Sequence, residues 1–414
     1  MKRILIHSLI FSPDGVSTAY LYNDIALRLQ QRGYDVVVLT TTPHFNLVPN
    51  QLRAQPMRWK VWGLCKMSDF HGMTVLHVPQ KKFKSTVLRI LGFLYWHIVS
   101  FFIGLTIKHV DLILSPSPPL TIGLLNLWLG KLKGCKVVYN VQEIYPDILK
   151  LEGGITLKFL KRIERKVYNG SDAVTTIDQI FYDTIVGRFK DASKLHIIPN
   201  FVDTELYREL NDMQVNKLLD RSIFPQNDSI KLLYAGNIGH AQAWEPLIEL
   251  AEKTRDVNVE YIVIGEGAKR DYVASEIVKR GLQNVRLLPY LSRNIMPAVL
   301  SYSDASFIFM ATENDRDGFP SKVYTIMACE RPLLVMSGEK TPIVNFLKDK
   351  GCAKLVTERD FEKKVSETVA WLRNVTKEDL RAMGKNGVEE IRKHYTKEIV
   401  SDMYVDLMDS LLLS

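Results

Sequence analysis

The chain has 414 residues, of which 46% are hydrophobic and 24% are charged, and its formal net charge is +8. These values are typical of a globular protein and exclude an intrinsically disordered chain. The length is too great for one typical hydrophobic core and predicts two domains of roughly 200 residues each. The four cysteines are far apart and form no Cys-x-x-Cys pair, which argues against zinc binding and against a disulfide framework.

The N-terminus reads Met-Lys-Arg-Ile-Leu-Ile-His-Ser, with a short apolar run and no small-residue cleavage pattern. It therefore predicts a first strand and not a signal peptide. Strands and helices then alternate through the first half. We predict strands at residues 4–6, 36–39, 75–78, 112–114, 137–139, 173–176 and 195–198, and helices at 17–31, 120–132 and 157–167. This alternation predicts an α/β fold with a doubly wound parallel sheet.

A basic region precedes an apolar one within this first half. Residues 53–89 contain eight basic residues and one acid, and residues 91–107 form an almost uncharged run rich in aromatic side chains. Three interpretations fit the run: a membrane-spanning helix, a buried core helix beside a solvated basic loop, or a helix attached to an anionic membrane surface. We expect peripheral attachment of residues 81–108. Nucleic acid is not an expected partner, because the basic residues adjoin apolar surface and not a polar groove.

The second half repeats the same rhythm after a polar stretch. Residues 211–229 are polar and predict an irregular boundary. Strands are then predicted at 231–234, 259–264, 285–288, 305–309 and 333–336, and helices at 244–253, 270–280 and 323–328. We therefore predict two Rossmann-like domains, at residues 1–203 and 229–395, facing each other across a cleft. The amphipathic segment 396–414 is expected to return to the first domain as a helix.

Ligands of open α/β sheets bind beyond the carboxyl ends of the strands, so the loops there are candidate sites. Gly15 follows the first strand, and its small size can let backbone N–H groups approach a ligand. Glu143 and Asp147 follow a later strand and can bind a polar acceptor or take a proton from a hydroxyl. A plain turn and ordinary surface acids are the simpler alternatives. The loop at Gly15 lacks Gly-x-Gly-x-x-Gly, which argues against a dinucleotide-binding oxidoreductase.

In the second half, Gly236 and Gly239 favour a tight turn, rich in N–H groups, before a helix, which is a reasonable phosphate cradle. His240 has no partner histidines, so we interpret it as a solvent-facing loop residue and not as a metal ligand. Glu266 and Leu291 follow two further strands, where they can line a base pocket or belong to connecting turns.

Residues 313–328 carry the most specific local pattern, an acidic stretch and Gly-Phe leading into Pro320 and an apolar helical segment. Proline suits the first turn of a helix, so we predict a helix that begins near Pro320 with free N–H groups at Ser321 and Lys322. Such an end favours a phosphate, and Lys322 adds a full positive charge. Asp317 precedes the turn and can accept hydrogen bonds from a sugar hydroxyl. An acidic surface loop capping an ordinary buried helix is the alternative.

Taken together, these segments resemble the retaining nucleotide-sugar glycosyltransferases of family 4, which have the two-domain GT-B fold. The motifs are Pro-Asp-Gly at 13–15, Glu-Ile-Tyr-Pro-Asp at 143–147, Pro-Asn-Phe-Val-Asp at 199–203, Gly-Asn-Ile-Gly at 236–239, Gly-Glu-Gly at 265–267 and Gly-Phe-Pro-Ser-Lys-Val-Tyr-Thr-Ile-Met-Ala at 318–328. Each is weak alone, but their order and spacing make the resemblance strong over nearly the whole chain. It is nearest to transferases of bacterial surface-polysaccharide assembly, including those that add L-fucosamine to O-antigen.

The resemblance implies a UDP-sugar donor bound mainly by the second domain, and a lipid-diphosphate-linked saccharide acceptor approaching over the first. It implies no metal and no cofactor besides the donor, and a place on the cytoplasmic face of the membrane. Asp317 and Lys322 would be catalytic, and Glu143 and Asp147 would bind the acceptor. The residues assigned to the donor are Gly15, Gly239, Gln242, Glu266, Leu291, Gly318, Phe319, Pro320, Ser321 and Thr325.

The chain departs from the family pattern at three places. The family has a second acid with seven residues between it and the first, and here the residue at that separation from Asp317 is Thr325. The basic residues usual after the glycine of the second domain's first loop are replaced by Asn237 and neutral neighbours that include Gln242, and the usual Gly-Gly of the first loop is Gly15-Val16. A GT-B-like sugar-nucleotide epimerase is the alternative function, although it gives no reason for the basic and aromatic segment.

Overall fold

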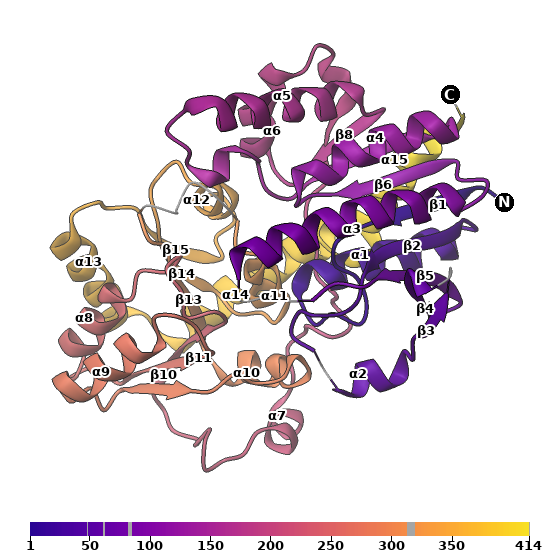
Figure 1. Ribbon diagram of the computed structural model, residues 1–414. Coiled ribbons are helices and arrows are strands. Elements are labelled where there is room, and N and C mark those ends of the chain that lie inside the picture. Colours follow the sequence, from indigo (N-terminus) through magenta and orange to yellow (C-terminus); the bar gives the residue numbers. More distant parts are fainter. Residues whose placement is uncertain (48, 61–62, 82–84, 313–318, 414) are drawn as a thin grey trace. The chain divides into compact units, whose positions relative to one another are not determined.

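A computed structural model describes residues 1–47, 49–60, 63–81, 85–312 and 319–413 of the chain (Figure 1). The chain divides into two compact units. Unit 1 comprises Met1–Asn200 and Lys397–Ser414, and unit 2 comprises Phe201–Thr396. Both units are α/β structures built on a mainly parallel sheet, as the alternating pattern predicts.

The sheet of unit 1 has nine described strands in the order β3-β4-β5-β2-β1-β6-β7-β8-β9. Their bounds are β1 Arg3–His7, β2 Asp35–Thr41, β3 Arg58–Lys60, β4 Cys65–Phe70, β5 Met73–Val78, β6 Leu112–Pro116, β7 Lys136–Val141, β8 Ala173–Thr176 and β9 Leu195–Ile197. The central strands β1, β2, β6 and β7 are buried almost throughout, which explains their continuous apolar runs. The pairings from β5 through β9 are all parallel.

One edge of this sheet departs from the predicted parallel arrangement. The strands β3 and β4 pair antiparallel, and β4 pairs antiparallel with β5. The sequence pattern did not indicate either strand, because β3 is fully exposed and β4 alternates polar and apolar residues. Antiparallel edge strands of this kind can face water on one side.

The helices of unit 1 are α1 Ser17–Gln31, α2 Pro49–Ala54, α3 Thr86–Thr106, α4 Leu120–Lys133, α5 Gly154–Gly170, α6 Gln179–Ile185 and α15 Lys397–Leu413. In Figure 1, α3, α4 and α5 lie in front of the sheet, and α1 and α15 lie behind it. Trp96, Ile103 and Ile107 point from the α3 segment into a core shared with strand residues such as Leu39 and Ile113. The opposite side of α3 is exposed, so the interpretation of a fully buried core helix is wrong.

The last helix, α15, belongs to unit 1, as expected for residues 396–414. It packs along α1, where Asp402 accepts hydrogen bonds from Arg28, at 2.5 and 2.7 Å, and from Arg32, at 2.9 Å. Asn140 at the end of β7 donates to the Tyr404 hydroxyl at 2.9 Å and accepts from the Tyr22 hydroxyl at 2.6 Å. These bonds tie α15 and α1 to the centre of the sheet.

Unit 2 contains a parallel sheet of six described strands in the order β12-β11-β10-β13-β14-β15. The strands are β10 Ile230–Ala235, β11 Val259–Ile264, β12 Val285–Leu288, β13 Ala305–Phe309, β14 Leu333–Met336 and β15 Ala353–Val356. The helices are α7 Asp212–Leu218, α8 Glu245–Lys253, α9 Arg270–Arg280, α10 Met296–Tyr302, α11 Lys322–Ala328, α12 Pro342–Leu347, α13 Phe361–Asn374 and α14 Lys377–His394.

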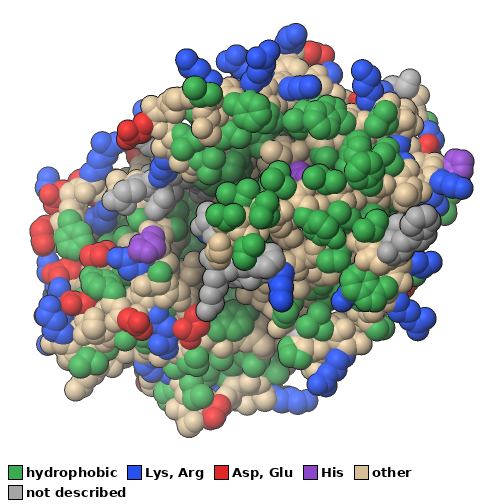
Figure 2. Space-filling model, viewed as in Figure 1, with side chains coloured by type: hydrophobic (Ala, Val, Ile, Leu, Met, Phe, Trp, Pro, Cys, Tyr) green, Lys and Arg blue, Asp and Glu red, His purple; other side chains and the backbone are tan. Residues whose placement is uncertain are grey.

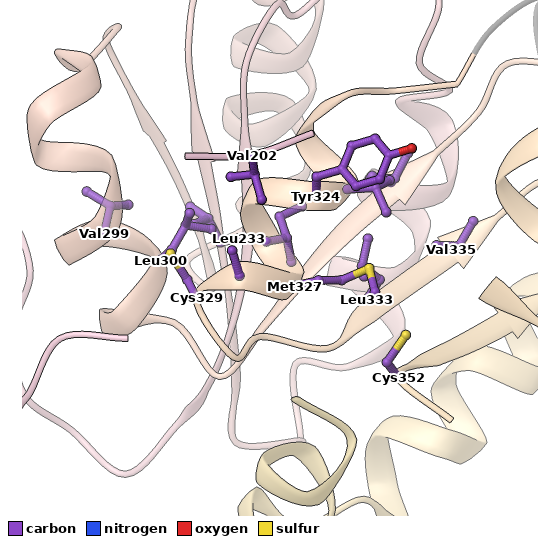
Figure 3. Packing of buried hydrophobic residues seen from close by; sticks show 14 of the residues in the cluster. Val202, Leu233, Val299, Leu300, Tyr324, Met327, Cys329, Leu333, Val335 and Cys352 are labelled. Atoms are coloured by element: carbon purple, nitrogen blue, oxygen red, sulfur yellow. The ribbon is translucent and has the colours of Figure 1, made fainter. Parts of the chain in front are cut away.

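The helix α11 is short and almost entirely buried. Its residues Val323, Tyr324 and Met327 pack in a cluster with Leu233 of β10 and Val335 of β14 (Figure 3). At α14, Gly384 lies so close to the turn after α11 that an added Cβ would be 2.0 Å from the Glu330 carbonyl oxygen. A packed core therefore holds one side of α11, and α14 lies against the turn that follows its last residue.

The polar stretch at 211–229 is not irregular throughout, so that prediction is wrong in part. Residues Asp212–Leu218 form α7, which begins with a capping box in which Asn211 and Gln214 bond each other's backbone N–H groups. Val215 and Leu219 enter the core of unit 2. Two buried apolar residues are enough to hold a two-turn helix in the folded unit, although they leave almost no periodic signal in the sequence.

Candidate functional site

The candidate site in unit 2 is organised around Lys322, the first residue of α11. The helix begins two residues after Pro320, with Ser321 as its N-cap. The carbonyl oxygens of Pro320 and Ser321 accept from the N–H groups of Val323, at 3.0 Å, and Tyr324, at 3.2 Å. The expected helix start is thus close to its predicted position, and it presents a cation at the positive end of a helix.

The ammonium of Lys322 lies over the face of Tyr234, with Nζ 3.9 Å from the ring centroid. A cation over a tyrosine ring is attracted by the negative face of its π-system. Burial nevertheless lowers the pKa of Lys322 to about 8, because protein atoms replace the water that would hydrate the charge. An anion bound beside Nζ would favour the charged form again. Binding of a phosphate would therefore raise the pKa of Lys322 again.

Tyr234 also shapes the loop that follows β10. Its hydroxyl donates to the Asn237 carbonyl at 2.6 Å, and its ring meets that of Trp244 edge to face at 4.9 Å. The Trp244 Nε1–H in turn donates to the Gly239 carbonyl at 3.0 Å. Two aromatic residues thus fix both ends of the 237–239 turn from within the core.

Glycine is required where this loop meets Lys322 and the loop after β11. Gly236 has a φ of +146°, and an added Cβ would lie 2.6 Å from the Lys322 Nζ. Gly265 has the same φ, and its Cβ would lie 1.9 Å from the Gly236 carbonyl oxygen. Two backbone hydrogen bonds join the loops. The Gly236 N–H donates to the Ile264 carbonyl at 2.9 Å, and the Ile238 N–H donates to the Glu266 carbonyl at 2.8 Å. The expected phosphate cradle is therefore a rigid double loop and not a single turn.

Only part of the predicted N–H cradle is available. The N–H groups of Gly236 and Ile238 already bond to carbonyls of the neighbouring loop. Those of Asn237 and Gly239 have no backbone or side-chain acceptor within the described part of the chain. A ligand at this loop would therefore be bound through the N–H groups of Asn237 and Gly239.

The other donor residues of unit 2 occupy distinct places. Glu266 is exposed and forms a 3.4 Å ion pair with Arg270, whose Nε also donates to the Gly265 carbonyl at 3.2 Å. Gln242 pairs with Met310 at the end of β13, and its buried Oε1 lacks a hydrogen-bond partner within the described residues. Two apolar members, Leu291 and Phe319, are partly buried and pack on the core around α11.

Thr325, which stands where the family has an acid, donates its hydroxyl to the Lys322 carbonyl at 2.9 Å. It is therefore bonded within its own helix. The predicted catalytic acid Asp317 and the donor residue Gly318 lie outside the described residues.

In unit 1, the loop at Gly15 is held by its neighbour Asp14. The Asp14 Oδ1 accepts from the N–H groups of His44, at 2.8 Å, and Phe45, at 2.7 Å, and the Gly15 N–H itself donates to the Phe45 carbonyl at 3.0 Å. Gly15 thus has no free N–H to offer a ligand. The buried Asp14 Oδ2 has no partner in the described part of the chain, and desolvation raises the pKa of this carboxyl. Asp14 was not among the residues that we predicted from the sequence.

The two predicted acceptor acids have different surroundings. Partial burial works to raise the pKa of Asp147, but hydrogen bonds from Lys161 and Arg188 outweigh it and hold the pKa below its ordinary value. Both cations also pair with Glu164, which is fully buried on α5, so Asp147 is part of a structural ion-pair network. Burial instead raises the pKa of Glu143, to which the described network gives no cation. Glu143 is the better candidate to accept a proton.

Sequence reasoning missed Tyr234 and Arg270, which complete the surroundings of Lys322 and the double loop. Tyr234 is read from the sequence as one more apolar strand residue, and only the packing of α11 across β10 places it under the lysine. Among the described residues, no group of three or more His, Cys, Asp or Glu side chains is placed to hold a metal ion.

The site thus consists of a lysine at a helix start beside a glycine double loop in the second α/β unit. Two family models match the chain: Glycosyltransferase Family 4 over residues 19–206, and Glycosyl transferases group 1 over residues 216–389. The chain belongs to the family-4 glycosyltransferases with the GT-B fold, as the sequence motifs indicate.

The chain is similar to one curated protein and to two solved structures of bacterial origin in particular. The chain is 24% identical over 343 residues to the colanic acid biosynthesis glycosyl transferase WcaI of Escherichia coli. The aligned region covers 79% of this chain and 81% of WcaI. Its fold is similar to that of HepE (Alr3699) of Anabaena in complex with UDP, with a TM-score of 0.73 and 14% identity over 99% of this chain and 100% of HepE. It is also similar to WaaG, a glycosyltransferase involved in lipopolysaccharide biosynthesis, with a TM-score of 0.66 and 13% identity over 97% and 98% of the two chains.

Proposed function

We propose that the protein transfers a sugar, with retention of configuration, from a UDP-sugar to a lipid-diphosphate-linked saccharide during synthesis of a bacterial surface polysaccharide. The observation that carries the proposal is the Lys322 ammonium, held 3.9 Å above Tyr234 and against the glycine double loop. UDP is the proposed nucleotide because HepE, which has the same fold, was solved with UDP bound. The resemblance to L-fucosamine transferases makes N-acetyl-L-fucosamine the first donor sugar to assay.

In the proposed reaction, the bond between the sugar C1 and the diphosphate oxygen breaks while the acceptor oxygen attacks C1 from the same face. The acceptor proton passes to the leaving diphosphate. Lys322 stabilises the charge that develops there, which for one donor of this kind amounts to roughly 3–4 kcal/mol. Asp317 is proposed to orient the donor sugar, and Glu143 or Asp147 to orient the acceptor. Neither a metal nor a cofactor besides the donor is part of the proposal, so EDTA is expected to leave turnover unchanged.

The proposed acceptor is lipid-linked, and the exposed side of α3 supports the proposal of a membrane surface. Val87–Thr106 has a mean hydropathy of 1.7, and its length and composition would allow it to cross a membrane. Only 22% of this apolar segment is buried in the protein. The exposed apolar side chains of α3, which we call the α3 face, are Val87, Leu88, Ile90, Leu91, Leu94, Tyr95, Ile98, Phe102 and Leu105. Figure 2 shows hydrophobic side chains gathered over this part of unit 1.

A helix that is packed on one side and apolar on the other suits a position in the membrane interface. We therefore propose that the α3 face lies on the anionic cytoplasmic surface of the membrane, where a lipid-linked acceptor would be found. The basic residues of the 81–108 segment that flank this face, such as Arg89 and Lys108, would favour an anionic surface.

The test of the proposed function is a screen of UDP-, GDP- and dTDP-sugars for thermal stabilisation, followed by transfer assays with a lipid-linked acceptor. We expect a UDP-sugar to stabilise the protein and to be consumed only when acceptor is present. Replacing Lys322 with alanine should reduce turnover about a hundredfold or more, since one stabilising donor is lost from the transition state. Near-normal transfer by Lys322→Ala would refute the role of Lys322, and conversion of the donor without acceptor would indicate an epimerase.

A further inference from the structure

A basic groove lies in unit 1 between the end of α5 and the 3-10 turn Val186–Arg188. Its volume is about 570 Å³, and the residues that line it are Arg165, Lys166, Asn169, Gly170, Gly187, Arg188, Phe189 and Lys190. Four of these eight residues are cationic, and none is acidic. Sequence reasoning assigned no role to these basic residues.

The frame of the groove is ordered by internal bonds. The Asn169 side chain donates to the Arg188 carbonyl at 3.1 Å and accepts from the Lys190 N–H at 2.7 Å. The Phe189 ring stacks on Tyr168, with the planes 5° apart and the centroids at 5.1 Å. The groove is therefore a formed feature of the folded unit and not a gap between loose side chains.

The four cations are not equivalent. Arg188 pairs with Glu164 and Asp147, so its charge is compensated. Arg165, Lys166 and Lys190 are exposed, and among the described residues no carboxylate lies within ion-pair distance of any of them. Three uncompensated positive charges around one formed groove are suited to an anion with several oxygens, such as a phosphate.

Apolar surface adjoins the groove. The Lys166 Nζ lies 5.8 Å over the ring of Trp128 on α4, and this tryptophan is 49% exposed. Leu132 on α4 is 66% exposed, and Phe159 on α5 is 61% exposed. The helix α4 contacts both α3 and α5, so these side chains continue the α3 face toward the groove. In Figure 2 the hydrophobic area is bordered by basic side chains along the edge that α5 forms in Figure 1.

We propose that this groove binds the phosphate of an anionic phospholipid headgroup while Trp128, Leu132 and Phe159 enter the membrane interface beside it. A soluble phosphate compound would use the cations but would leave the large exposed apolar side chains without a role. A membrane lipid can contact the cations with its charged headgroup and the apolar side chains with its acyl chains, because headgroup and acyl chains adjoin at the membrane interface. The inference rests on the membrane partner of the proposed function but not on the transfer reaction.

The experiment is co-sedimentation with vesicles of phosphatidylglycerol and phosphatidylethanolamine, with phosphatidylcholine vesicles as the neutral comparison. The test variant is Arg165→Gln/Lys166→Gln/Lys190→Gln. The matched control is Arg381→Gln/Lys385→Gln/Lys393→Gln on α14 of unit 2, where all three side chains are exposed. Each basic residue near an anionic surface contributes roughly fivefold to binding. We expect about a hundredfold weaker binding to anionic vesicles for the triple variant, and at most a small change for the control.

Equal binding of the triple variant, the control and the wild-type protein would overturn the proposal. It would also be overturned if millimolar glycerol phosphate displaced the protein from vesicles, or if an oligonucleotide bound the groove with the same dependence on the three residues. Thermal stabilisation by UDP is measured on every variant. Loss of vesicle binding with intact UDP binding supports the groove and shows that the variant is folded, whereas absence of UDP binding in all proteins counts only against the proposed function.

Discussion

The charge of Lys322 should reduce the stability of the protein in the absence of nucleotide, and Lys322→Met should therefore stabilise it. The pKa of Lys322 falls from an ordinary 10.5 to about 8. That change corresponds to about 3 kcal/mol of unfavourable burial of the charge. Attraction to the Tyr234 ring, at 3.9 Å, offsets about 1 kcal/mol of this. We expect the unfolding free energy of Lys322→Met to exceed that of the wild type by about 2 kcal/mol at pH 7.

The difference must depend on pH in one direction. Between pH 8 and 10.5 the unfolded wild-type chain holds a proton that the folded protein has lost, so wild-type stability rises with pH in this window. The advantage of the methionine variant is thus full below pH 8 and disappears as the pH approaches 10.5. The matched control is Lys385→Met, the same change at an exposed lysine on α14.

The assay is urea unfolding of both variants and the wild type at pH 7, 8, 9 and 10, without nucleotide and with saturating UDP. UDP should reverse the order of stability at pH 7, because the diphosphate interacts with the charge that methionine lacks. A methionine variant that is less stable than wild type at pH 7 would refute the reasoning. So would a stability difference that stays constant from pH 7 to pH 10.

Two further substitutions test the packing that holds the site and the last helix. Gly265→Ala places a methyl group 1.9 Å from the Gly236 carbonyl oxygen at a φ of +146°, so we expect at least about 3 kcal/mol of destabilisation and loss of UDP-induced stabilisation. Thermal shifts with and without UDP check this, and unchanged nucleotide binding would contradict it. Asp402→Ala removes the bonds to Arg28 and Arg32 between α15 and α1 and should cost about 1 kcal/mol by urea unfolding, with UDP binding retained. A loss of UDP binding in Asp402→Ala would contradict the assignment of α15 to unit 1.

Much of the fold could be predicted because its parallel strands are buried on both faces. The strands β1, β2, β10 and β11 are short continuous apolar runs. Each can therefore be recognised from its own residues, without knowledge of the rest of the fold. The edge strands β3 and β4 pair with near neighbours in the sequence, β3 with β4 and β4 with β5. They were missed because they are largely exposed and lack the continuous apolar run that marks a buried strand.

The candidate site also has features that could be predicted from the sequence and features that could not. Lys322 could be predicted because proline, helix start and lysine are adjacent in the sequence. Its partner Tyr234 is 88 positions earlier, and only the fold brings the two together. The ion pairs of Asp147 with Lys161 and Arg188 likewise form only in the folded protein. The sequence shows the three charged residues but not their pairing. Sequence patterns thus locate the loops of the site, and the fold decides what each side chain does there.

The path of the chain also sets an order of events during synthesis. Unit 1 begins at Met1 but is completed only by Lys397–Ser414, after all of unit 2 has been made. Until then, α1 lacks the helix that packs along it, and the Asn140 amide lacks the Tyr404 hydroxyl. The first 200 residues therefore cannot complete unit 1 until α15 has been made, and a chain that ends before α15 lacks part of unit 1 although it contains all of unit 2.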